Sequence, residues 1–144
     1  KDMPESVCAY LKITGQTAPD YDGIGQIARI IMESLALQYK AAFMDLCRAS
    51  GRVLDAVNIL GGGIQNKLLT QFTANALGVK VYAGPIEATS VGNILMQAYG
   101  AGELSSLEEL RQIVIDTYEP ETYHPEEPDL WQKAYQKFVS IVRS

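Results

Sequence analysis

Residues 53–83, "VLDAVNILGGGIQNKLLTQFTANALGVKVYA", contain the pattern that decides the fold of this chain. The apolar run at 53–60 is typical of a buried strand, and it leads directly into Gly61, Gly62 and Gly63. Apolar residues then recur at helical spacing from about 65 to 77, and 79–83 reads as a second strand. A strand, a helix and a strand in this order predict parallel pairing and an α/β layered fold.

Amphipathic patterns predict helices on both sides of this unit. Their expected ranges are a short helix ended by Gly15, a long helix over 24–50, a helix over 88–102, one over 105–116 that starts with a capping box, and a last one over 130–142. We expect Thr89 or Ser90 to cap the helix over 88–102. The stretch 118–129, which contains three prolines, is expected to be a loop.

Composition limits the classes of function. A chain of 144 residues with 47% apolar content fits a single globular domain. Its net charge of −5 argues against nucleic-acid and anionic-membrane partners. No apolar run is long enough to span a membrane, and Cys8 and Cys47 lack the spacing of a zinc site or a disulfide framework. We therefore expect a cytoplasmic protein with free thiols.

The three glycines predict a ligand site, because a strand that ends in glycines and opens a helix presents unpaired N–H groups. The dinucleotide fingerprint Gly-x-Gly-x-x-Gly fits at Gly61 and Gly63 but fails at Asn66, and no acidic residue ends the second strand. A Walker A loop is excluded, because no Lys-Ser or Lys-Thr pair follows the glycines. A tight turn without any ligand stays open as the alternative.

Two stretches resemble a known family. "GGGIQNKLLTQFTANALGVKVYAGPIEATSVGN" (61–93) is similar to the adenosine-binding segment of FGGY-type carbohydrate kinases, and "IARIIMESLALQY" (27–39) is similar to that family's second signature, with Arg29 and Glu33 in register. "AGPIEATSVGN" (83–93) and "ETYHP" (121–125) resemble the family's rhamnulokinase branch.

The resemblance implies an actin-like kinase with two ribonuclease-H-like domains, which hold ATP and a sugar between them. Residues 1–144 would form most of the C-terminal, ATP-binding domain, without the N-terminal domain. The implied reaction transfers the γ-phosphoryl group of ATP to L-rhamnulose, with Mg²⁺ ligands, catalytic base and most sugar contacts outside this chain. Alternatives are another sugar of the family (xylulose, fuculose or glycerol) and a stand-alone nucleotide-binding module without catalysis.

The resemblance places the cofactor-binding residues at Gly61, Gly62, Gly63 and Asn66, and it implies no catalytic or metal-binding residue in this chain. The four-residue spacing of Arg29 and Glu33 favours an ordinary structural ion pair. Gly92, inside a helix, is expected where a neighbouring backbone or the nucleotide approaches closely. We expect Trp131 in the core or at a domain interface, and no catalytic role for the loop residue His124.

Overall fold

Three strands form one small mixed sheet in the order β1-β2-β3. The computed structural model describes residues 2–20 and 22–142. Strand β1 (Ala56–Ile59) pairs in parallel with β2 (Lys80–Ala83), with Val57 opposite Val81 and Ile59 opposite Ala83. This pairing confirms the strand-helix-strand unit, although β1 is shorter than the run at 53–60. The prediction that this strand is buried is wrong, because β1 lies at the edge of the sheet and is half-buried, with Asn58 exposed.

Strand β3 (Glu121–Tyr123) was not expected, and the prediction of a continuous loop over 118–129 is wrong there. It pairs antiparallel with β2, and its Tyr123 lies opposite Val81. Pro120 and Pro125 flank the strand, and prolines are tolerated beside an edge strand because no ladder hydrogen bond is lost there. The strand forms because Tyr123 is buried, with 8% of its surface exposed.

The predicted helices are present. They are α1 (Met3–Ile13), α2 (Ile24–Ser50), α3 (Lys67–Leu77), α4 (Ala88–Gly100), α5 (Leu107–Thr117) and α6 (Pro128–Val142), and a short 3₁₀ turn, η1 (Gly62–Gln65), precedes α3. The capping prediction holds for α5, where the Ser106 side chain accepts from the Glu109 N–H at 3.1 Å. It is wrong for α4, which begins directly after Glu87, so that Thr89 and Ser90 lie inside the helix.

Helix α3 is the centre of the packing. One of its faces covers the sheet through a cluster that contains Ala74, Val81, Ala83 and Tyr123. Its other face meets α2 and α6 in a second cluster, Ala36, Leu37, Phe72, Ala76 and Trp131, in which the Phe72 and Trp131 ring centroids lie 5.3 Å apart. Trp131 is therefore a core residue, which is the first of the two predicted places, the core or a domain interface.

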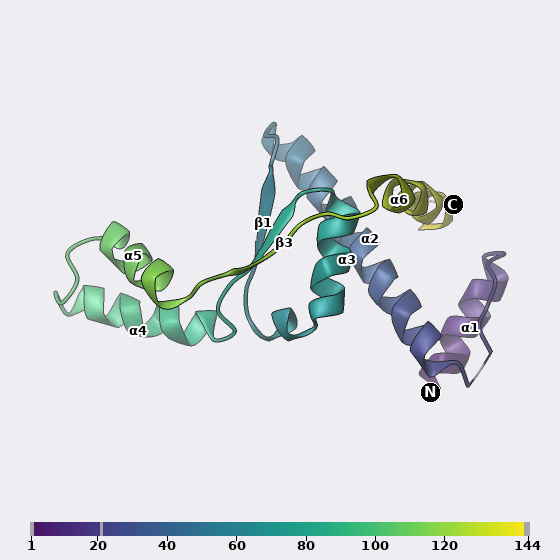
Figure 1. The fold of residues 1–144 in the computed structure, drawn as a ribbon, viewed down its shortest axis with the longest axis horizontal. Coiled ribbons are helices and arrows are strands. Elements are labelled where there is room, and N and C mark those ends of the chain that lie inside the picture. Colours follow the sequence, from purple (N-terminus) through teal and green to yellow (C-terminus); the bar gives the residue numbers. More distant parts are fainter. Residues whose placement is uncertain (1, 21, 143–144) are drawn as a thin grey trace.

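Figure 1 shows the resulting arrangement, in which α3 lies between the sheet and α2. Helices α4 and α5 form a hairpin that extends from the carboxyl end of β2, and α1 lies at the opposite end of the molecule (Figure 1). The described helices include none long and apolar enough to cross a membrane. Cys8 and Cys47 are free, as expected, and Cys8 is buried.

Candidate functional site

The glycine turn, residues 61–66, lies beside the turn that follows β2. The Gly61 N–H donates to the Pro85 carbonyl at 3.1 Å, and the Gly84 N–H donates to the Ile59 carbonyl at 2.8 Å. Both turns follow the carboxyl ends of parallel strands, which is where open α/β sheets bind ligands. The structure thus brings together two segments that the sequence separates by about twenty residues.

The three glycines have different reasons to be glycine. Gly61 has φ +87°, in the region that side chains disfavour, so the backbone itself requires glycine there. A Cβ added to Gly62 or Gly63 would meet no heavy atom within 4 Å in the described part of the chain. The fold therefore tolerates side chains at Gly62 and Gly63, and their absence leaves the backbone open to an approaching ligand.

Asn66 caps helix α3. Its Oδ1 accepts from the Leu69 N–H at 3.1 Å, and the helix begins at Lys67, two residues after the predicted start. The first-turn N–H groups and the positive end of the helix dipole therefore point toward the glycine turn. Because the cap occupies Oδ1, the amide keeps its NH₂ group for other partners, and its contact with a ligand stays a prediction.

Charged and phenolic groups cluster beside this helix start. The Lys67 ammonium lies 3.2 Å from Glu121 Oε1, an exposed ion pair that raises the pKa of Lys67. The pKa of Glu121 is lowered, first by the nearby Tyr123 hydroxyl and then by Lys67. Burial raises the pKa of Tyr123, and the nearby Glu121 carboxylate raises it further. The Tyr123 hydroxyl lies close enough to Glu121 to affect its charge but not in the geometry of a hydrogen bond with it or with any other described residue.

Arg29 and Glu33 form the ion pair that their spacing predicts. The Arg29 Nε lies 2.7 Å from Glu33 Oε1, and the Arg29 guanidinium carbon lies 5.4 Å from the Phe72 ring centroid. For Gly92 the prediction of a neighbouring backbone is wrong, because no described residue outside the helix's own backbone comes within 4 Å of a Cβ built there, and close approach of the nucleotide stays a prediction. His124 is exposed, and its carbonyl accepts from Gln71 Nε2 at 2.8 Å.

Sequence reasoning missed two long-range contacts, one at each end of α3. The Asn66 Nδ2 lies 3.8 Å from the Met32 sulfur, between residues 34 positions apart. The buried Asn75 holds the chain after β3, because its Oδ1 accepts from the Glu126 N–H at 2.9 Å, across 51 positions. Local sequence patterns do not predict contacts over such separations, because hydrophobic periodicity indicates only which face of a helix or strand is buried.

No metal site is evident in the described ranges, 2–20 and 22–142, where no three His, Cys, Asp or Glu residues come together to hold an ion. The candidate site at residues 61–66 consists of a backbone turn, a helix N-terminus and an amide. Such groups bind polar or anionic ligands and supply no obvious proton-transfer or metal chemistry.

Comparison with known proteins gives concordant results. The curated relatives include rhamnulokinases of Bacteroides thetaiotaomicron, 42% identical over 142 residues, and of Halalkalibacterium halodurans, 34% identical over 122 residues. These alignments cover 99% and 85% of this chain but 29% and 26% of the relatives. The chain thus spans less than a third of their length.

Solved structures show the same fold. Plasmodium falciparum glycerol kinase with ADP matches with a TM-score of 0.68 and 20% identity, over 81% of this chain and 23% of that one. Xylulose kinase from Rhodospirillum rubrum matches with a TM-score of 0.62 and 16% identity, over 80% of this chain and 23% of that one. These matches agree with the expected α/β, actin-like fold class. The model of the C-terminal domain of the FGGY family of carbohydrate kinases matches residues 2–101, and the chain therefore belongs to that family.

Proposed function

We propose that this chain is the C-terminal, adenine-nucleotide-binding part of a cytoplasmic carbohydrate kinase that transfers the γ-phosphoryl group of ATP to L-rhamnulose. The observation that carries the proposal is the glycine turn, where Gly62 and Gly63 lack side chains that the fold would tolerate. Close approach of a ligand to the backbone explains this absence. The family supports the kinase reaction, and the names of the relatives support the sugar.

Within this proposal, residues 1–144 form one domain that binds and orients the adenosine end of ATP through Gly61, Gly62, Gly63 and Asn66. The catalytic base, the Mg²⁺ ligands and most of the sugar contacts belong to the remaining length of the longer protein. Mg²⁺, when bound, neutralises charge on the phosphates during transfer.

The experiment is an amide NMR titration of the 144-residue chain with ADP. We expect weak binding, with a Kd on the order of 1 mM, which corresponds to about 4 kcal/mol. The shifts should concentrate at residues 61–66 and 87–93. Gly62→Val should abolish them, because the valine side chain occupies the space that the nucleotide needs.

Gly25→Val is the matched control, because Gly25 also has open space around its Cβ position but lies in the first turn of α2. This variant should bind ADP like the unmodified chain. GDP and NAD serve as ligand controls, and preferential binding of NAD would favour a dinucleotide site instead. No ADP-dependent shift at millimolar concentration, or unchanged binding by a folded Gly62→Val variant, would contradict the proposal.

A further inference from the structure

Gly84, in the turn after β2, is glycine for a different reason from Gly61. Its φ lies outside the left-handed region, so its backbone does not require glycine. A Cβ built at Gly84, however, would collide with the Leu60 Cδ2 atom and would lie 3.6 Å from the Ile59 carbonyl oxygen. The Leu60 side chain therefore packs directly on Gly84 and occupies the space that a side chain there would need.

Two backbone hydrogen bonds flank this contact. The Gly84 N–H donates to the Ile59 carbonyl at 2.8 Å, and the Gly61 N–H donates to the Pro85 carbonyl at 3.1 Å. In each bond one partner is a direct chain neighbour of Leu60. The side-chain contact and the two bonds therefore act on the same short stretch of backbone, and together they join the glycine turn to the turn after β2.

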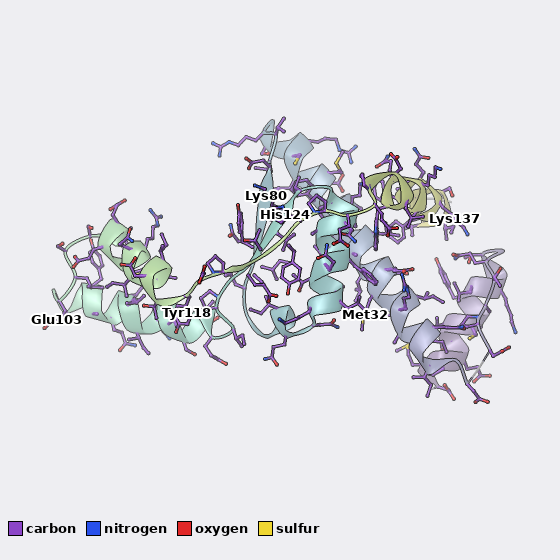
Figure 2. The ribbon with its side chains drawn as sticks, in the orientation of Figure 1. Met32, Lys80, Glu103, Tyr118, His124 and Lys137 are labelled. Carbon is purple, nitrogen blue, oxygen red and sulfur yellow. The ribbon has the colours of Figure 1, made fainter. Side chains whose placement is uncertain are left out.

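Leu60 contributes little to the core. It is 58% exposed, and neither core cluster of the described residues includes it. It lies just after β1, at the end of the sheet opposite Lys80, which Figure 2 labels. An apolar side chain over backbone hydrogen bonds keeps water from them, and such bonds are stronger where the local dielectric constant is lower. The contact of Leu60 with Gly84 thus supports the two turns and not the core.

We propose that Leu60 is a positioning residue, which packs on Gly84 and keeps the two hydrogen bonds closed, so that a ligand meets residues 61–66 already in place. The inference rests on the proposed function, which puts the nucleotide at this turn. A preformed turn loses less conformational freedom on binding than a mobile one, so it binds its ligand more tightly. Gly84 acts only through Leu60, because it leaves room for the leucine.

The test measures ADP affinity by NMR titration for Leu60→Ala, Gly84→Ala and the double variant. The first change removes the leucine and the second displaces it, so we expect each to weaken binding about threefold to fivefold. Because both changes abolish the same contact, the double variant should bind about as the weaker single variant does, and not with the product of the two losses. Leu60→Met keeps an apolar side chain of similar volume and should bind ADP within about twofold of the unmodified chain.

Leu130→Ala and Gly25→Ala are the matched controls. Leu130, on α6, has the same exposed fraction as Leu60, 58%, and Gly25, on α2, has open space at its Cβ position. Neither change should alter ADP affinity, because neither residue contacts the two turns.

A second measurement needs no ligand. Hydrogen exchange of the Gly61 and Gly84 amides, which donate the two bonds, should be faster in Leu60→Ala and in Gly84→Ala than in the unmodified chain. Unchanged exchange and ADP affinity, with or without a loss of stability in urea, would overturn the positioning role of Leu60. So would multiplied losses of affinity in the double variant, which would show that the contact is not the cause. Absence of ADP binding by the unmodified chain overturns the proposed function and this role together, even where exchange shows that the contact holds the turn.

Discussion

At the residue scale, the three adjacent glycines of the turn are glycine for different physical reasons. Gly61 is needed by its backbone angle, whereas Gly62 and Gly63 are surrounded by open space in the described structure. A substitution at Gly61 therefore tests the fold, and one at Gly62 tests the ligand. This distinction makes Gly62→Val informative, because loss of binding by that variant cannot be blamed on a strained turn.

Tyr123 provides a prediction for alkaline pH. Its pKa is raised from 10.0, mainly by burial, so the folded protein keeps the phenol neutral where the unfolded chain ionises. The resulting contribution to stability is present below about pH 10 and is lost as pH rises toward the raised pKa. In Tyr123→Phe this loss of stability at alkaline pH should disappear. At pH 7 the free energy of unfolding of the variant should stay within about 1 kcal/mol of that of the unmodified protein, because the hydroxyl has no hydrogen-bond partner among the described residues.

Urea unfolding at pH 8 and at about pH 11 measures this difference. Tyr10→Phe is the control, because Tyr10 is 52% exposed whereas Tyr123 is buried. Equal alkaline losses in Tyr123→Phe and in the unmodified protein would show that burial of this phenol has no part in the pH dependence.

At the scale of elements, α3 connects the parts of the molecule. It covers the sheet, packs against α2 and α6, and holds the segment between β3 and α6 through Gln71 and Asn75. Asn75 is 5% exposed, and its Oδ1 accepts from both Gln71 Nε2, at 2.7 Å, and the Glu126 N–H, at 2.9 Å. This buried amide thus anchors the chain that leads into α6.

Asn75→Ala should lower the free energy of unfolding by about 1 to 3 kcal/mol, because the Glu126 N–H loses its acceptor in a partly buried place. Asp116→Ala on α5 is the matched control. It also removes an acceptor from a glutamine four residues away, Gln112, but in exposed surroundings, and it should change stability by no more than about 0.5 kcal/mol. Urea unfolding of both variants decides the matter, and equal effects would contradict an anchoring role for Asn75.

At the scale of the whole molecule, the chain matches one part of a longer enzyme. Alignment with the rhamnulokinases covers 29% and 26% of their lengths, and the proposed function assigns the catalytic base, the metal ligands and most of the sugar contacts to the remainder. On this proposal, the glycine turn at the carboxyl end of β1, seen in Figure 1, is the nucleotide-binding surface, and the groups that the transfer itself requires lie outside residues 1–144.

We accordingly expect the 144-residue chain alone to make no sugar phosphate from ATP. General acid-base catalysis contributes about a hundredfold to ten-thousandfold, and a metal ion contributes several kcal/mol more, so their loss leaves no practical rate. The longer protein should phosphorylate L-rhamnulose with a higher kcat/KM than xylulose, fuculose or glycerol. Activity of the purified chain, free of host kinases, would refute the first expectation, and a preference for another sugar would refute the second.

The sequence by itself determined the parallel strand-helix-strand unit and the family. Hydrophobic periodicity, glycine turns and sequence motifs are local properties, which can be recognised without knowing the tertiary contacts. It placed α2, α3 and the start of α5 within a few residues. It could not place β3, since burial of Tyr123 against Val81 depends on a partner strand about forty residues away. Nor could it orient the Asn66 amide, whose two ends are assigned by the α3 backbone and by Met32 on another helix. Only tertiary structure decides such contacts, because they arise when distant segments are packed against the same core.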